Sequence, residues 1–185
     1  MTGNRQLTVL GSTGSIGRST LDVVSRCDNI SVFALSAYRN SELLLSQCLQ
    51  YKPRYAVLAD PEQHQHFKRL LAESGCKTEF LDTEDALEFI AAHEQVDVVM
   101  AAIVGAAGLA SGLAAVSAGK RLLLANKESL IMSGKLFIEA AKQNNADIIP
   151  IDSEHNAIFQ CLAETRSGLS VPDGRFVDKL VLTAS

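Results

Sequence analysis

Apolar runs rich in β-branched residues alternate along the chain with stretches in which apolar residues recur every three or four positions. The first pattern is typical of buried strands, and the second of helices that pack one face against a core. Strands are predicted at 6–10, 31–36, 54–59, 77–81, 96–102, 120–124 and 147–151. Helices are predicted near 15–26, 40–51, 62–74, 83–93, 107–118, 127–143 and 153–164.

The order of these elements predicts the fold class. Strands such as 96–102 and 120–124 are apolar along nearly their whole length, which is typical of a parallel sheet covered by helices on both faces. Because strands and helices alternate, we expect an α/β protein with a doubly wound parallel sheet of the Rossmann type.

The character of the chain changes after Pro150, where a helical stretch leads into a polar loop. We expect residues 1–150 to form a cofactor-binding domain and residues 151–185 to begin a second α/β domain, truncated at Ser185. The last apolar run, 179–185, predicts a strand that stops at the edge where α/β folds build their sites. The sequence therefore suggests the N-terminal part of a longer protein.

A turn with three regularly spaced glycines, Gly11, Gly14 and Gly17, lies between the first predicted strand and the first predicted helix. Strand, glycine turn and helix form the phosphate cradle of dinucleotide-binding folds, because the backbone can approach a pyrophosphate and the helix N-terminus attracts it. Hydroxyl donors are added around the same turn by Ser12, Thr13 and Ser15. The alternative is an ordinary tight turn that uses glycine for its conformation alone.

The second predicted strand bears on the choice of cofactor. NAD-binding folds place an acid near its end to bind the ribose hydroxyls. Here Arg39 occupies that window, and no acid stands beside it in the sequence. A guanidinium would instead pair with a 2′-phosphate, which favours NADPH over NADH. The alternative is a solvated loop cation.

Two acidic residues, Asp152 and Glu154, follow the strand predicted at 147–151. In extended backbone, positions two apart share a face, and two carboxylates at a strand end could hold Mg²⁺ or Mn²⁺. The alternative is a helix N-terminus, with Asp152 or Ser153 as the cap and Glu154 in the first turn. A cap and a metal ligand can share one turn, so the sequence leaves both interpretations open.

Another predicted strand ends just before Lys127, which opens a helix. Cations are unfavourable at helix N-termini, so a lysine here points mildly to a function. Beside a nucleotide cleft, its ammonium could meet a substrate hydroxyl or phosphate.

Composition narrows the classes of function. The chain of 185 residues is 47% hydrophobic and 21% charged, with a net charge of −4, as in ordinary soluble domains. No basic run favours nucleic acid or an anionic membrane, and no apolar stretch is long enough to cross a bilayer. The four cysteines are scattered and no signal peptide is seen, so we expect reduced core thiols and a cytoplasmic location.

Taken together, four segments resemble the 1-deoxy-D-xylulose 5-phosphate reductoisomerase family of non-mevalonate isoprenoid biosynthesis. The segments are 11–17, 101–109, 124–130 and 152–160, in family order and spread over the chain. The resemblance implies a homodimeric enzyme with residues 1–150 as its NADPH domain. Its reaction isomerises and reduces 1-deoxy-D-xylulose 5-phosphate to 2-C-methyl-D-erythritol 4-phosphate with NADPH and Mg²⁺, Mn²⁺ or Co²⁺.

The resemblance also implies roles for single residues. Cofactor contacts are expected from Gly11, Thr13, Gly14, Ser15, Ile16, Arg39, Asn40, Asn126 and Glu128. Substrate contacts are expected from Lys127, Ser153 and Glu154, with Lys127 and Glu154 catalytic. Metal ligation is expected from Asp152 and Glu154. The family often has glycine where this chain has Tyr38, which could reshape the loop that carries Arg39.

Two other functions compete with this interpretation. An NADP-dependent semialdehyde dehydrogenase needs a cysteine nucleophile, and none of the four cysteines stands convincingly at a predicted strand end. A non-catalytic NADP-binding module would keep the glycine turn but would not need Asp152 and Glu154. We expect the reductoisomerase, with the 185-residue chain alone binding NADPH and turning nothing over.

Overall fold

The computed structural model describes residues 3–125, 127–162 and 178–181. Seven parallel strands form one sheet in the order β4-β3-β2-β1-β5-β6-β7. The strands are β1 (Arg5–Leu10), β2 (Ile30–Ala37), β3 (Tyr55–Leu58), β4 (Glu79–Leu81), β5 (Val98–Ala101), β6 (Arg121–Leu124) and β7 (Ile148–Pro150). Without β4, this is the order of the Rossmann fold, so the predicted fold class is confirmed.

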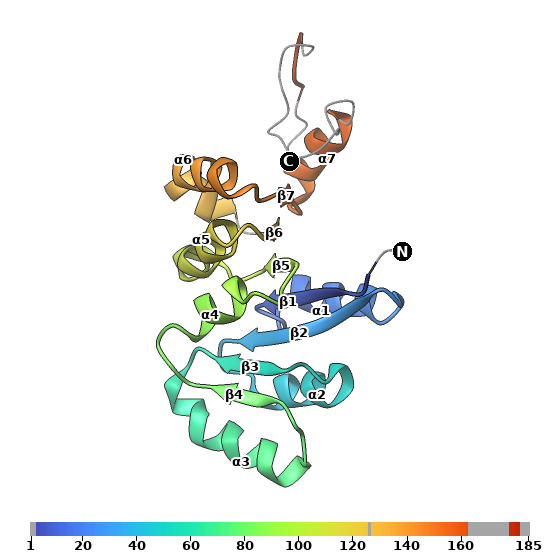
Figure 1. The fold of residues 1–185 in the computed structure, drawn as a ribbon, viewed down its shortest axis with the longest axis vertical. Helices are drawn as coiled ribbons and strands as arrows, with labels where there is room; N and C mark the ends of the chain where they lie inside the picture. Colours follow the sequence, from blue (N-terminus) through green and yellow to red (C-terminus); the bar gives the residue numbers. More distant parts are fainter. Residues whose placement is uncertain (1–2, 126, 163–177, 182–185) are drawn as a thin grey trace.

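Helices cover both faces of the sheet. The α-helices are α1 (Ser15–Val24), α2 (Ser41–Tyr51), α3 (His64–Ser74), α4 (Ala86–Ala92), α5 (Leu109–Ser117), α6 (Lys127–Asn144) and α7 (Ser153–Cys161), with short 3₁₀ turns η1 (Pro61–Gln63) and η2 (Gly105–Gly108). In Figure 1, α1 and α2 lie on one side of the sheet, and α4, α5 and α6 lie on the other. The chain therefore winds outward from β1 in one direction and then, from β5, in the opposite direction.

The predicted elements differ from the structure mainly at their ends. The helix predicted at 62–74 begins with η1, and the one predicted at 107–118 is preceded by η2. The helix expected over 153–164 ends at Cys161. Most of the strand expected at 179–185 lies outside the described residues, and residues 179–181 form no strand. Helix ends fray and take 3₁₀ geometry, so differences of this size are ordinary.

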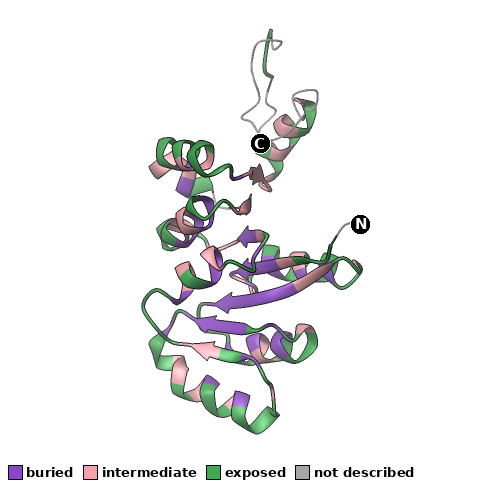
Figure 2. Ribbon diagram, viewed as in Figure 1, coloured by how far each residue is buried: buried purple, intermediate pink, exposed green. Residues whose placement is uncertain are grey.

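The buried strands explain the apolar runs. Leu7 and Val9 of β1 pack in the cluster that includes α1 and α2, whereas Leu10 packs in the cluster on the α4 and α5 side. Between them, Thr8 is fully buried and donates to the carbonyl of Ile90 in α4 at 2.9 Å. Figure 2 shows burial concentrated in the central strands. Because both faces are covered, a strand here needs apolar residues at nearly every position.

One irregularity interrupts the pairing of β1 with β2. Leu7 pairs with Val32, but Thr8 pairs with Ala34, so the register shifts between Leu7 and Thr8. The extra residue on β2 is Phe33, which is buried. Beyond this bulge the pairing continues, with Val9 opposite Leu35.

No helix of the described residues is both long and apolar enough to cross a membrane. All four cysteines are free, as the sequence predicted. The expectation that all are core thiols is wrong, because only Cys48 is buried and Cys161 is exposed at the end of α7. Burial raises the pKa of the Cys48 thiol to about 12.

This difference in exposure predicts a difference in reactivity. Only the thiolate reacts with alkylating reagents, so at pH 8 the buried, protonated Cys48 should stay unlabelled while Cys161 reacts with iodoacetamide. Peptide mass spectrometry after labelling with and without urea measures both sites. Rapid labelling of Cys48 without urea would contradict the packing of α2 against the sheet.

Candidate functional site

The chemistry-bearing residues leave the sheet at one edge, because all strands are parallel. Along this edge Asp60 follows β3, Arg39 follows β2, the glycine turn follows β1, Lys127 follows β6 and Asp152 follows β7. Neighbouring strands lie about 4.8 Å apart, so the glycine turn and the end of β7 are separated by about 14 Å. The reversal of strand order falls between β1 and β5, where such folds bind ligands.

The glycine turn is held by backbone packing. Gly11 has a φ of 82°, and a Cβ there would lie 2.8 Å from the carbonyl oxygen of Ala102. At Gly17 a Cβ would lie 2.5 Å from the Cα of Ser12 and nearer still to the carbonyl oxygen of Gly11. Both positions therefore exclude larger residues, because the obstructing atoms are backbone atoms.

Helix α1 begins at Ser15 with Gly14 as its N-cap, and no side chain caps it. Its first N–H groups have no partner within the helix and point toward the edge of the sheet. Ser15 and Ile16 are exposed there, and Thr13 is half-buried. These are the groups that an anion at a helix N-terminus contacts.

The sequence predicted that three hydroxyls around this turn are available to a ligand, and for Ser12 this is wrong. Ser12 is fully buried, and its hydroxyl donates to Oε1 of Gln47 at 2.6 Å. Of the three hydroxyls predicted around the turn, only those of Thr13 and Ser15 are accessible. Ser12 belongs to the support of the turn instead.

Arg39 is not the isolated cation that its sequence neighbours suggest. Its Nη2 lies 3.1 Å from Oδ2 of Asp60, and its guanidinium lies 5.2 Å from the centre of the Tyr38 ring. The Asp60 side chain is only 7% exposed, whereas that of Arg39 is 64% exposed. An acid does stand beside Arg39, supplied by the next strand, and sequence proximity could not reveal it. A guanidinium has five N–H donors, and this contact with Asp60 uses one of them.

Asn40 lies beside Arg39 and caps α2. Its Oδ1 accepts the N–H of Leu43 at 3.1 Å. The side-chain oxygen is therefore occupied by the helix, and the amide nitrogen is the group left for a ligand.

Lys127 and the two carboxylates meet across neighbouring strands. Leu124 of β6 pairs with Pro150 of β7, so the residues that follow each strand come together. Nζ of Lys127 lies 3.6 Å from Oδ2 of Asp152 and 3.9 Å from Oε1 of Glu154. The prediction that these groups share one site is consistent with this geometry.

Of the two local arrangements considered for Asp152 and Glu154, the helix N-terminus is the one found. Asp152 is the N-cap of α7 and Glu154 lies in its first turn, so the extended arrangement is wrong. Asp152 accepts no side-chain cap hydrogen bond. The Ser153 hydroxyl donates to Oε2 of Glu154 at 2.7 Å.

These neighbours lower the pKa of Glu154. The hydrogen bond from the Ser153 hydroxyl and one from a backbone N–H bring it to about 2, and the charge of Lys127 adds to the effect. Two hard oxygen donors at a helix N-terminus suit Mg²⁺ or Mn²⁺, which keep several other ligands. Within residues 3–125, 127–162 and 178–181, no group of three or more His, Cys, Asp or Glu residues could hold a metal. Among the described residues, this point of the edge brings together two carboxylates, Asp152 and Glu154.

The last two expected cofactor contacts are Asn126 and Glu128. Asn126 lies outside the described residues. Glu128 is exposed in the first turn of α6, next to Lys127.

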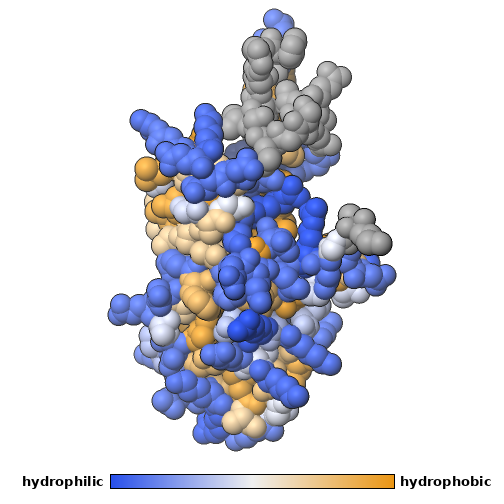
Figure 3. All heavy atoms as spheres, in the orientation of Figure 1, coloured by the Kyte–Doolittle hydropathy of each residue, from blue (hydrophilic) through white to orange (hydrophobic). Residues whose placement is uncertain are grey.

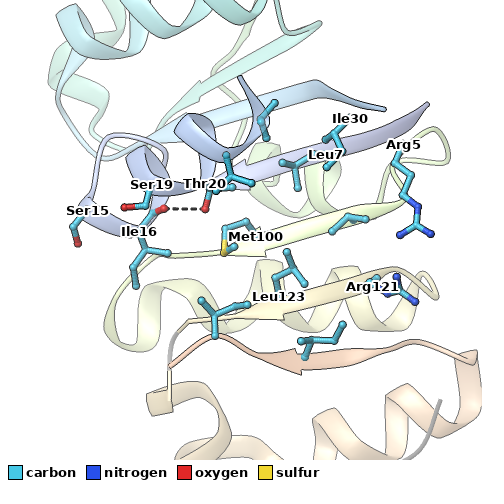
Figure 4. Close-up of a pocket in the computed structure, with 15 residues that line it drawn as sticks. Arg5, Leu7, Ser15, Ile16, Ser19, Thr20, Ile30, Met100, Arg121 and Leu123 are labelled. Carbon is cyan, nitrogen blue, oxygen red and sulfur yellow. Dashed lines mark hydrogen bonds between the residues drawn. The ribbon is translucent and has the colours of Figure 1, made fainter. Parts of the chain in front are cut away.

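An apolar groove adjoins this edge. It has a volume of about 730 Å³ and lies between α1 and the face of β1, β5, β6 and β7 that α1 partly covers. Ser15 and Ile16 line it at the edge of the candidate site, and Arg5 and Arg121 line its other end (Figure 4). Elsewhere, polar side chains cover most of the face seen in Figure 3.

The sheet order and the glycine turn at the reversal point define a dinucleotide-binding fold of the Rossmann class. The model of the family described as 1-deoxy-D-xylulose 5-phosphate reductoisomerase matches residues 7–134, more than half of the chain. The chain therefore belongs to the 1-deoxy-D-xylulose 5-phosphate reductoisomerase family.

Curated relatives carry the same name. The protein from Saccharophagus degradans is 56% identical over 182 residues, covering 98% of this chain and 46% of that protein. The one from Tolumonas auensis is 55% identical over 183 residues, covering 97% and 46% respectively. The chain thus spans less than half the length of these relatives.

Solved structures agree. A DOX-P reductoisomerase in complex with NADPH, fosmidomycin and magnesium superposes with a TM-score of 0.81 at 46% identity, covering 85% of this chain and 38% of that one. The 1-deoxy-D-xylulose 5-phosphate reductoisomerase from Zymomonas mobilis in complex with NADPH superposes with a TM-score of 0.82 at 46% identity. The match covers 87% of this chain and 42% of that one.

The close approach at Gly17 predicts the effect of a single methyl group. Gly17→Ala forces the turn away from α1 and should cost about 1–3 kcal/mol of stability. The control is Gly134→Ala, because a Cβ at that helical position meets nothing within 4 Å. Thermal unfolding followed by circular dichroism compares the two. Equal midpoints for both variants would show that the turn is not packed as described.

Proposed function

We propose that the chain is the NADPH-binding part of a 1-deoxy-D-xylulose 5-phosphate reductoisomerase and contributes part of its metal and substrate site. The reaction isomerises 1-deoxy-D-xylulose 5-phosphate and reduces the product to 2-C-methyl-D-erythritol 4-phosphate. Residues 1–150 form the cofactor domain, and residues 151–185 begin the catalytic domain. Membership of the family supports this assignment.

The observation that carries the proposal is the order of groups along one sheet edge. A guanidinium follows β2, a glycine turn follows β1, and an ammonium with two carboxylates follows β6 and β7. In this order, the guanidinium suits the 2′-phosphate of NADPH and the glycine turn suits its pyrophosphate. The ammonium and the carboxylates suit a sugar phosphate and a metal ion next to the nicotinamide. In one solved structure of a DOX-P reductoisomerase, NADPH, fosmidomycin and magnesium are present in the same complex.

The residues have separate tasks in this proposal. The turn at Gly11, Thr13, Gly14, Ser15 and Ile16 binds the cofactor phosphates, Arg39 and Asn40 bind its adenosine end, and Asn126 and Glu128 line the nicotinamide side. Substrate contacts come from Lys127, Ser153 and Glu154, and metal ligation from Asp152 and Glu154.

When bound, a divalent cation held by Asp152 and Glu154 would supply a Lewis acid, and NADPH would supply the hydride. Lys127 donates hydrogen bonds to a substrate oxygen and stabilises negative charge that develops on it. Its ammonium already lies within 4 Å of both carboxylates, so it is held at the site without substrate. Glu154 is anionic at neutral pH, as an ordinary glutamate is, and its lowered pKa of about 2 keeps it so in moderately acidic solution as well.

The competing functions are less well supported. A semialdehyde dehydrogenase needs a cysteine at the site, but Cys48 lies within α2 and Cys161 at the end of α7. Cys27 and Cys76 lie beyond the ends of α1 and α3, away from the carboxyl ends of the strands. A non-catalytic NADP-binding module would not need the cluster of Lys127, Asp152 and Glu154.

Other parts of the assignment remain predictions. They are a homodimer, a cytoplasmic location and the absence of turnover by the 185-residue chain alone.

The assignment of Arg39 predicts a change in cofactor preference. Arg39→Gln removes a charge-assisted hydrogen bond to a 2′-phosphate, worth about 1.5–3 kcal/mol, so NADPH affinity should fall about 10–100-fold while NADH affinity stays the same. Fluorescence titration of the intact protein with each nucleotide measures both.

A matched control is Arg54→Gln. Arg54 also places its guanidinium over a tyrosine ring, 5.0 Å from the centre of Tyr55, but it lies at the opposite edge of the sheet. Its substitution should leave both affinities unchanged. An equal loss of NADPH and NADH in Arg39→Gln would overturn the role of Arg39.

The assignment of Asp152 predicts a loss of metal affinity. Asp152→Asn removes one anionic ligand, so Mn²⁺ affinity of the intact protein should fall at least about tenfold and turnover with it. Electron paramagnetic resonance of free Mn²⁺ measures binding. Asp147→Asn is the control, because Asp147 lies at the other end of β7 and pairs with Arg121 at 2.7 Å. Unchanged Mn²⁺ binding in Asp152→Asn would exclude the metal site.

A further inference from the structure

Gln47 makes a buried, two-point contact with the glycine turn. It lies in α2 and is only 6% exposed. Its Nε2 donates to the carbonyl oxygen of Ser12 at 2.9 Å, and its Oε1 accepts the Ser12 hydroxyl at 2.6 Å. The oxygen and the nitrogen of the Gln47 amide therefore both form hydrogen bonds to Ser12, which lies 35 positions away in the sequence.

Ser36 at the end of β2 adds a second support. Its hydroxyl accepts the N–H of Gly11 at 3.0 Å, and its carbonyl accepts the N–H of Ser12 at 2.7 Å. Ser36 is 1% exposed. The backbone of Gly11 and Ser12 is thus fixed from β2 and α2.

The same β2–α2 unit carries the adenosine end of the proposed cofactor site. Arg39 and Asn40 lie between Ser36 and Gln47 in the sequence. The contacts of Gln47 therefore join the loop with Arg39 to the turn after β1. Buried hydrogen bonds of this kind hold a single arrangement, because losing one partner leaves a buried polar group unsatisfied.

We propose that Gln47 is a positioning residue for cofactor binding: it fixes the glycine turn in the conformation that takes the pyrophosphate. A turn with three glycines has many accessible conformations, and holding it in one before binding reduces the entropy lost on binding. This inference rests on the proposed function, since it assumes that the turn binds the dinucleotide.

The pyrophosphate is common to NADPH and NADH, and this sets the test. Gln47→Met keeps the length of the side chain but removes both hydrogen bonds. In the intact protein, Kd for NADPH and for NADH should rise by the same factor, about tenfold, as for the loss of one to two hydrogen bonds. KM for NADPH should rise likewise, while kcat at saturating NADPH stays within about twofold.

The matched control is Gln50→Met. Gln50 lies in the same helix but is exposed, so its substitution should change neither Kd. If Gln47→Met does not fold, Ser36→Ala removes only the hydroxyl that accepts the Gly11 N–H and should raise both Kd values in the same direction.

The outcomes separate this inference from the proposed function. A lower thermal midpoint with both Kd values unchanged would make Gln47 a structural brace alone and overturn the proposal. Weaker binding of NADPH but not NADH would place the effect at Arg39 and overturn it as well. Failure of the unaltered intact protein to bind either nucleotide would overturn the proposed function first, and this inference with it.

Discussion

The parallel direction of all seven strands is the constraint on which the site depends. Each strand delivers its following loop to the same edge, so residues far apart in the sequence become neighbours without any loop having to travel. The reversal of strand order between β1 and β5 then separates the loops that suit a cofactor from those that suit a metal and a substrate. Strand order therefore decides which loops lie together at the site, and the side chains on those loops then decide its chemistry.

The electrostatics of the edge are balanced in pairs. Arg39 is accompanied by the buried Asp60, and Lys127 by Asp152 and Glu154. Charges in partly exposed pairs are screened and worth little to stability, so these arrangements say more about ligands than about folding. Each pair holds a long, flexible cation close to where an anionic ligand would arrive.

Patterns within short windows predicted most of the fold. The apolar runs located the seven strands, and the glycine spacing located the turn. The support of that turn escaped prediction, because Gln47 and Ser12 are brought together only by tertiary packing. The same holds for Asp60 beside Arg39. The choice between extended and helical backbone at Asp152 was ambiguous for another reason, since the same residues suit a cap and a strand end.

The bulge at Phe33 has a geometric consequence. By adding one residue to β2, it places Ser36 opposite Leu10 rather than opposite Gly11, given that Val9 pairs with Leu35. From there the Ser36 carbonyl and hydroxyl reach the two N–H groups that follow β1. Had the pairing continued from Leu7 and Val32 without the bulge, Ser36 would lie opposite Gly11, about 3.3 Å further along β1, the rise of one strand residue. The bulge thus sets the position of the loop after β2 relative to the glycine turn after β1.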